Sequence, residues 1–211
     1  FLLINLINIL NRNFIYLLAS SYNSPYNKLI NIKCNSKPRI YVISHRYSFI
    51  DVLIASKEIS KYQQKDLYSV TSCSKTLSKT LNYLFKLTKG VNIIWYRTGN
   101  NSSKKLNAKL KQKENIAIFI VPNCERTGLY YLTKNNDVDT VLIDIKSNYK
   151  LSENQIDTNS LSTEFQFFCH NFLQMLNKQY DVSVKQINLK KYLPLGSKKF
   201  MEKVNEIIYK N

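Results

Sequence analysis

The sequence predicts an α/β fold: a single domain in which helices flank a mostly parallel, mixed sheet, preceded by an apolar, amphipathic N-terminal helix. Three observations support this. Short apolar runs typical of buried strands alternate with longer segments of helical periodicity. The 211 residues are 44% hydrophobic, which is enough to bury a core and too much for a disordered chain. The chain contains only four Gly and four Pro, and this low content excludes a collagen-like or linker-dominated protein.

The first element is the apolar segment 1–18, which we expect to form an amphipathic helix. Asn5, Asn8 and Arg12 are spaced by three and four positions, so they share one face, opposite a face of Leu and Ile. The segment is shorter than a transmembrane span and has polar residues along one face, so we expect it to lie at a membrane surface. The alternative is that it packs on the α/β domain. No basic stretch precedes it, which disfavours a cleaved signal peptide.

The remaining elements follow in order along one continuous domain. The predicted boundaries are residues 1–24 for a membrane-associating helix with its linker, and 25–211 for the α/β domain. Strands are expected at 39–44, 67–71, 91–96, 116–121, 138–145 and 182–189. Helices are expected at 50–61, 75–89, 102–113, 164–180 and 198–209, with a polar loop at 147–163. Because the chain begins with Phe1 and not Met, we expect further residues to precede it.

The net charge narrows the classes of partner, and the cysteine spacing narrows the kinds of disulfide or metal site. The chain has 31 Lys and Arg against 14 Asp and Glu, a formal net charge of +17. This favours an anionic partner such as anionic lipid, a phosphorylated substrate or nucleic acid. The four Cys show no C-x-x-C spacing, so neither a disulfide framework nor a cysteine zinc site is expected. A Gly-rich phosphate loop does not occur, which disfavours a nucleotide-hydrolysing enzyme.

Candidate functional residues are expected just after the strands, because ligands of open α/β sheets bind beyond the carboxyl ends of the strands. These positions include His45, Arg97 and the loop that ends in Arg126. Arg is scarce in this Lys-rich chain and binds phosphate with two parallel hydrogen bonds. His45 with Asp51, at the start of the following helix, is a candidate general base that takes a proton from a hydroxyl. The alternative for Asp51 is a favourable charge in a first helical turn.

Segments at these strand ends resemble, in order, the motifs of the glycerolipid acyltransferases, the family of the lysophosphatidic acid acyltransferases. SHRYSFID (44–51) resembles the first motif, Asn-His followed after four residues by Asp. Gly90 followed by IIWYR (93–97) resembles the second, a Gly and a short apolar strand that ends in Arg. IFIVPNCERT (118–127) resembles the third, Phe-Pro-Glu-Gly-Thr-Arg-Ser, and TVLIDI (140–145) occupies the place of the fourth.

The chain departs from the family pattern in two motifs. Asp51 follows His45 by six positions (51 − 45 = 6) where the family has five, and Ser44 replaces the Asn of the first motif. A loop can absorb the added residue if the contact between the two side chains is re-made. In the third motif Pro122 and Arg126 match, while Asn123, Cys124 and Glu125 replace Glu, Gly and Thr. Glu125 is a candidate replacement for the lost carboxylate.

The resemblance implies an acyltransferase of phospholipid biosynthesis. It would move a fatty acyl group from acyl-CoA or acyl-carrier protein to the hydroxyl of a lysophospholipid or glycerol phosphate, most simply converting lysophosphatidic acid to phosphatidic acid. His45 would be the general base, Asp51 would orient it, and Arg97 and Arg126 would bind the acceptor phosphate. The supporting residues would be Ser44, Gly90, Pro122, Asn123 and Glu125.

The same resemblance implies where the protein works and what it needs. No metal and no cofactor are expected, because acyl-CoA is a co-substrate. Membrane lipid is the expected partner. The protein would be membrane-associated, either peripherally or through its N-terminal segment, with its active site on the cytoplasmic side.

Other functions remain open at the level of sequence. The departures in the motifs suggest a catalytically inactive relative that still binds lipid. The net charge and 15 Tyr suggest a basic nucleic-acid-binding protein, but no groove-reading motif occurs, so no nucleic-acid partner is expected. The second histidine, His170, lies beside Cys169 in a Phe-rich helical segment. It is expected to be structural, because adjacent helical residues point about 100 degrees apart.

Overall fold

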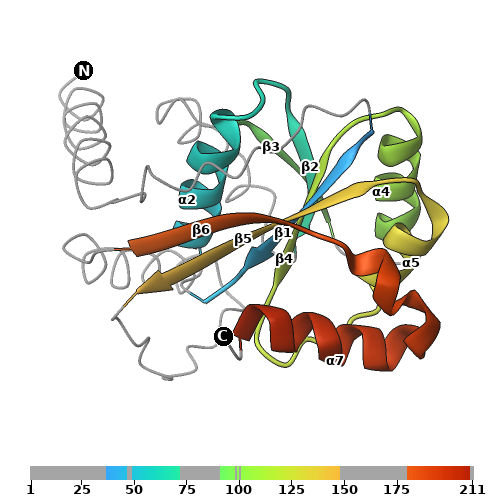
Figure 1. Cartoon of the computed structure of the whole chain (residues 1–211). Helices are drawn as coiled ribbons and strands as arrows, with labels where there is room; N and C mark the ends of the chain where they lie inside the picture. Colours follow the sequence, from blue (N-terminus) through green and yellow to red (C-terminus); the bar gives the residue numbers. More distant parts are fainter. Residues whose placement is uncertain are drawn as a thin grey trace, which may run out of the picture.

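The protein forms one six-stranded sheet in the order β3-β2-β4-β1-β5-β6 (Figure 1). The computed structural model describes residues 37–46, 49–71, 91–97, 99, 101–147 and 180–209. The strands are β1 Arg39–Ser44, β2 Leu67–Thr71, β3 Ile93–Arg97, β4 Ile116–Ile120, β5 Asp139–Ser147 and β6 Tyr180–Ile187. All neighbours pair in parallel except β6, which runs antiparallel to β5. The predicted α/β fold with a mostly parallel, mixed sheet is therefore confirmed.

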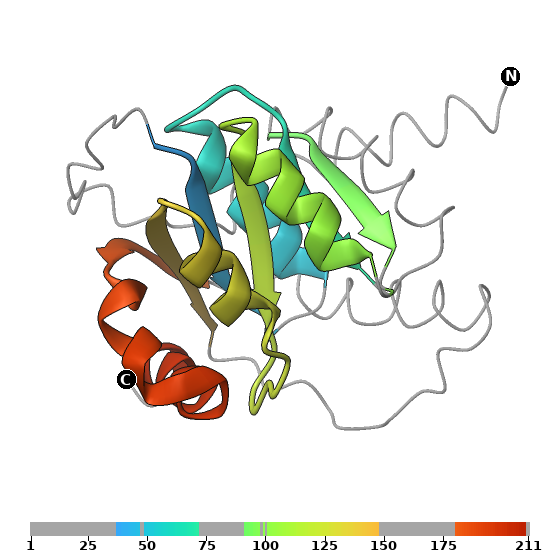
Figure 2. The ribbon, with the colours of Figure 1, turned by 90° about the vertical axis from the view of Figure 1, so that its right-hand side faces the viewer.

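Helices cover both faces of this sheet. They are α2 Phe49–Ser60, α4 Ser102–Lys111, α5 Gly128–Asn135, the 3-10 helix η1 Leu189–Leu195 and α7 Gly196–Tyr209. In Figure 2, α4 and α5 lie in front of the sheet and α2 lies behind it. Every residue of β1 is buried, because a central parallel strand is covered on both faces.

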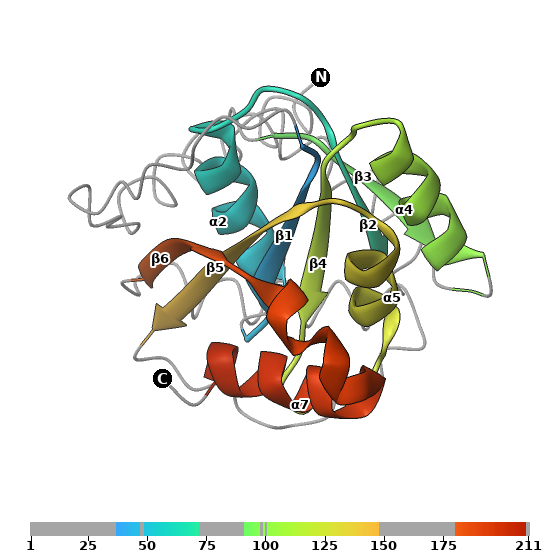
Figure 3. The ribbon, with the colours of Figure 1, turned by 45° about the vertical axis from the view of Figure 1, so that its right-hand side comes forward.

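Alternate residues of the strands fill the core on each face. Tyr41 and Ile43 of β1 pack with the apolar residues of α2. Ile40 and Val42 pack on the opposite side, with residues of α4, α5 and α7. The carboxyl ends of β1 and β4 point toward α7 in Figure 3. These ends are thus held between packed layers and provide a rigid base for the residues that follow them.

The structure differs from the predicted elements mainly in the C-terminal half. The sequence does not predict α5, which has only eight residues and contains Tyr and Thr, types that favour strands. It also does not predict η1, in which Pro194 lies inside the helix. The last strand begins and ends two residues earlier than the predicted 182–189, and α7 begins at Gly196 where the prediction begins at 198.

Several predicted elements lie outside the described residues. These are the N-terminal helix and linker (1–24), the helix at 75–89, the polar loop from 148 onward and the helix at 164–179. The boundary between 24 and 25 lies there as well. Among the helices that the structure does describe, none is long and apolar enough to cross a membrane.

Candidate active site

The candidate site lies at the carboxyl edge of the parallel strands, where β1 and β4 end next to each other. His45 directly follows β1, and its backbone N–H donates to the carbonyl of Ile120 at the end of β4 (2.8 Å). Asp51 lies in the first turn of α2, the helix that follows β1. The pair thus comes from the end of one strand and the start of the next helix, at the edge where ligands of such sheets bind.

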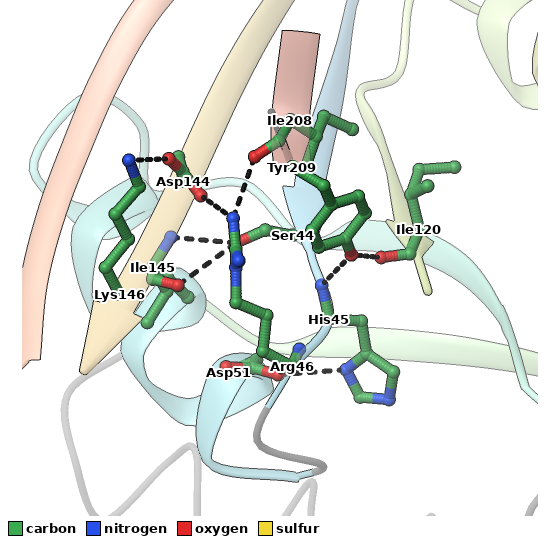
Figure 4. A network of polar contacts seen from close by, with 10 residues as sticks. All are labelled: Ser44, His45, Arg46, Asp51, Ile120, Asp144, Ile145, Lys146, Ile208 and Tyr209. Atoms are coloured by element: carbon green, nitrogen blue, oxygen red, sulfur yellow. Dashed lines mark hydrogen bonds and ion pairs between the residues drawn. The ribbon is translucent and has the colours of Figure 1, made fainter. Parts of the chain in front are cut away.

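The structure brings the imidazole of His45 and the carboxylate of Asp51 together. Nδ1 of His45 lies 3.2 Å from Oδ2 of Asp51 (Figure 4). The Asp51 side chain is fully buried, whereas that of His45 is 29% exposed. Oδ2 also accepts the backbone N–H of Arg46 at 2.7 Å. The spacing of six positions therefore leaves the carboxylate of Asp51 facing the imidazole of His45.

The contact between the two side chains is close without being a well-aligned hydrogen bond. Nδ1 is buried, and within the described part of the chain no acceptor meets it with hydrogen-bond geometry. The distance of 3.2 Å nevertheless lies at the edge of hydrogen-bond reach. Hydrogen bonds of catalytic pairs are often long or poorly aligned when no substrate is bound, so this geometry is compatible with a pair that acts together.

Aromatic side chains lie beside the imidazole on the α2 face of the sheet. The ring of His45 meets Phe119 edge to face, with centroids 5.7 Å apart. Phe119 in turn lies 5.6 Å from Trp95 of β3. In Figure 4 the second ring nitrogen of His45, Nε2, points away from Asp51. An apolar surface thus adjoins the partly exposed ring, while Nδ1 faces the carboxylate.

Ser44 has a structural position in this edge. Its buried hydroxyl accepts the backbone N–H of Ile145 at 2.7 Å and lies 3.5 Å from the carbonyl of the same residue. The side chain thereby continues the pairing of β1 with β5 beyond Ile43, the last paired residue of β1 in that ladder. Ser44 therefore supports the strand end from which His45 follows.

No sequence pattern marked Arg46, although it lies inside the segment 44–51. Its guanidinium donates to the carbonyl of Ile208 at 2.8 Å and to the carboxylate of Asp144 at 3.3 Å. Lys146 lies 3.5 Å from the same carboxylate. The scarcity of Arg could have marked Arg46, but its partners come from β5 and α7, about 100 to 160 positions away.

Tyr209 is a second residue that sequence reasoning missed. It ends α7, and its hydroxyl accepts the N–H of His45 at 3.1 Å and donates to the carbonyl of Ile120. Burial raises the pKa of Tyr209 to about 12, against opposing effects of the His45 N–H and of Arg46. The hydroxyl therefore remains protonated near neutral pH. No sequence pattern signals this contact, because it joins residues 164 positions apart.

The residues of the third motif lie on the loop that follows β4. Pro122, Asn123, Glu125 and Arg126 are all exposed. Asn123 has a left-handed backbone (φ 57°), which Asn adopts more readily than most residues. The carboxylate beside the imidazole is that of Asp51, while Glu125 is on this exposed loop.

Arg126 lines a hollow of about 200 Å³ between the sheet and the helices α4 and α5. Its other lining residues include Ser102 and Ser103 at the start of α4 and apolar residues such as Leu106 and Ile118. These apolar residues belong to the core opposite to α2. Arg126 therefore lies near the same sheet edge as His45, over the other face of the sheet from the imidazole.

Arg97 is the last residue of β3, at the outer edge of the sheet, and the structure describes its backbone only. Two strands, β2 and β4, lie between β3 and β1. At about 4.8 Å per strand spacing, the Arg97 backbone is roughly 14 Å from β1. Gly90 lies outside the described residues. The structure thus joins His45 with Asp51 and Ser44, while the two arginines follow other strands of the same edge.

Comparison with protein-family models and with curated proteins finds no match for this chain. Within the residues that the structure describes, no three His, Cys, Asp or Glu side chains are grouped to hold a metal ion. What the arrangement offers is a proton acceptor: an imidazole whose Nδ1 faces a buried carboxylate and whose Nε2 points away from it.

Proposed function

We propose that the protein is an acyltransferase that moves a fatty acyl group from acyl-CoA or acyl-carrier protein to a lysophospholipid or glycerol phosphate at a membrane. The observation that carries this is the 3.2 Å contact between His45 Nδ1 and the buried carboxylate of Asp51. It exists although the two residues are one position further apart than in the motif that they resemble. A His held by a carboxylate is the group that such a transfer needs.

The reaction uses the two ring nitrogens for different tasks. Asp51 favours the proton on Nδ1, so the lone pair of Nε2 accepts the proton of the acceptor hydroxyl. The hydroxyl oxygen attacks the thioester carbonyl, forming the ester C–O bond. The C–S bond then breaks, and the thiolate takes the proton back from Nε2. Proton and electron pairs balance without a covalent enzyme intermediate.

Other features of the same edge suit an anionic lipid acceptor. Arg126 is exposed on the loop after β4, where its guanidinium can bind a phosphate, so an acceptor that reaches both Arg126 and His45 would span the strand ends from one face of the sheet to the other. Phe119 and Trp95 provide apolar surface next to the imidazole, and such a surface suits the binding of an acyl chain. The net charge of +17 favours approach to anionic lipid and to the phosphates of CoA. We propose the membrane association of the protein on the same grounds.

The experiment is an acyl-transfer assay with the full chain, acyl-CoA or acyl-carrier protein as donor, and lysophosphatidic acid or glycerol phosphate as acceptor. We expect His45→Ala to lower turnover about a hundredfold or more, because general base catalysis contributes about 10² to 10⁴. His170→Gln, at the other histidine, is the matched control and is expected to retain turnover.

Two results would contradict the proposal. Wild-type turnover in His45→Ala would show that His45 is not the base. A folded wild-type chain that binds lipid vesicles but transfers no acyl group with any donor and acceptor pair would identify a lipid-binding relative without activity.

A further inference from the structure

Tyr209, at the end of α7, contacts the backbone of His45 from the far end of the chain. Its hydroxyl accepts the His45 N–H at 3.1 Å and donates its own proton to the carbonyl of Ile120 (Figure 4). A hydroxyl has one proton to donate and lone pairs to accept, so both bonds form together. One side chain therefore connects the ends of β1 and β4 to α7, at the backbone of the residue that carries the imidazole.

Packing determines where this hydroxyl lies. Phe200, Val204 and Ile208 are spaced by four along α7 and are buried in the core that α7 shares with α5. Phe200 meets Tyr130 of α5 edge to face, with centroids 5.4 Å apart. Because α7 is anchored along its length, the core and not the local backbone sets the position of Tyr209.

Arg46 fixes the ring of Tyr209. Its guanidinium lies 4.5 Å from the centre of that ring and donates to the carbonyl of Ile208. The backbone N–H of the same residue donates to Asp51 Oδ2 at 2.7 Å. The N–H of His45 is thus shared between the carbonyl of Ile120 at 2.8 Å and the hydroxyl of Tyr209 at 3.1 Å, and the next N–H, that of Arg46, is held by Asp51. The turn that carries the imidazole is held at both positions.

We propose that Tyr209 is a positioning residue whose hydroxyl holds the backbone of His45 so that Nδ1 stays opposite Asp51. It acts through the His45 main chain and not on a substrate. Its effect on turnover rests on the proposed function, whereas its effect on the imidazole does not. The neutral hydroxyl suits this task, because a phenolate could not donate to the carbonyl of Ile120.

Tyr209→Phe tests this proposal, because it keeps the ring under Arg46 and removes only the hydroxyl. We expect acyl transfer to fall about ten- to hundredfold in kcat with little change in KM, since small displacements of a reacting group cost about that much. Tyr192→Phe, which removes a hydroxyl from η1 beside the same core, is the matched control and should behave like the wild type. In Asp51→Asn, adding Tyr209→Phe should cost less than it does alone, because both changes act on the imidazole.

A readout independent of activity is the tautomer ratio of the neutral imidazole by ¹⁵N NMR. The signal lost in His45→Gln assigns the ring. We expect the ratio of the Nδ1–H to the Nε2–H form to fall about three- to tenfold in Tyr209→Phe and to stay unchanged in Tyr192→Phe. All samples are compared well below their melting temperatures, with sucrose added if Tyr209→Phe is unstable.

Each failure has a distinct signature. A wild-type chain without acyl transfer overturns the proposed function, while the tautomer ratio still tests Tyr209. A folded Tyr209→Phe with wild-type tautomer ratio overturns the positioning role, whatever the turnover. A lower melting temperature with unchanged tautomer ratio and kcat shows that the hydroxyl serves stability alone, and it overturns the role as well.

Discussion

The carboxylate of Asp51 accepts the N–H of Arg46 while it faces the imidazole of His45. A carboxylate that receives a backbone N–H is held in one orientation, and its place in the first turn of α2 favours its negative charge. Arg46 lies between His45 and Asp51 in the sequence and itself supplies the N–H that orients Asp51. The spacing of six positions is therefore compatible with a general base.

At the same scale, Arg126 is the residue that we expect to bind the acceptor phosphate. Arg126→Ala should raise KM for lysophosphatidic acid about tenfold or more with kcat nearly unchanged, because it removes binding common to ground and transition states. Arg126→Lys keeps the charge but not the paired hydrogen bonds, so its KM should be intermediate. Steady-state kinetics with a phosphate-free acceptor is the control, and an equal change in KM for that acceptor would contradict the role.

Among the elements, α7 and η1 determine how the C-terminal segment meets the sheet. α7 carries Tyr209 to the ends of β1 and β4, and η1 leads into α7 through Gly196, which has a positive φ of 79°. A side chain with a Cβ is strained in that conformation. Ion pairs connect the start of η1 to the amino ends of β5 and β1, at the opposite end of these strands from His45. Asp137, just before β5, lies 2.6 Å from Lys190 of η1 and 2.7 Å from Lys37, just before β1.

These ion pairs predict how stability depends on pH. Hydrogen bonds from Lys190 and Lys37 lower the pKa of Asp137 from 3.8 to about 2. A depressed pKa stabilises the folded state above the ordinary pKa, and this stabilisation is lost as the pH falls from about 4 to about 2. Asp137→Asn should therefore lower the melting temperature at about pH 6 and have little effect at about pH 2. Because the groups are exposed, added salt should reduce the difference. A pH-independent difference in thermal melts would contradict this account.

For the whole molecule, the strand order sets which residues share an edge. The parallel pairing of β3, β2, β4 and β1 brings their carboxyl ends to one side, so residues from distant motifs lie along one rim. The order also separates them, since two strands lie between Arg97 and His45. The net charge of +17 acts on the same scale, because it concerns the approach of any anionic partner.

We expect the full chain to co-sediment with vesicles that contain anionic lipid and to bind zwitterionic vesicles much less. Raising the salt concentration from about 0.1 M to about 1 M should release a large share of the protein, because the Debye length shortens from about 10 Å to about 3 Å. RNA added as a competitor tests the nucleic-acid alternative. Displacement from the vesicles by RNA at low concentration, or equal binding to both kinds of vesicle, would argue against a lipid partner.

The fold class and the central strands could be predicted from the amino-acid sequence alone. Buried parallel strands are continuous apolar runs, so 39–44, 67–71 and 116–121 could be located to within about a residue. The sequence also marked His45 and Asp51, because His45 directly follows a predicted strand and Asp51 lies at the start of the next predicted helix, and both signals are local. Local patterns did not mark α5, which is short and contains Tyr and Thr residues that favour strands, or η1 with its internal proline.

Which distant groups meet around His45 depends on how the whole chain packs. The partners of its backbone and of Arg46 come from β4, β5 and α7, and no periodicity in the sequence encodes such contacts. Strand order and helix packing fix them, and these depend on the whole core. For the same reason the sequence placed Arg97 and Arg126 at strand ends but could not tell how far from the imidazole each one lies.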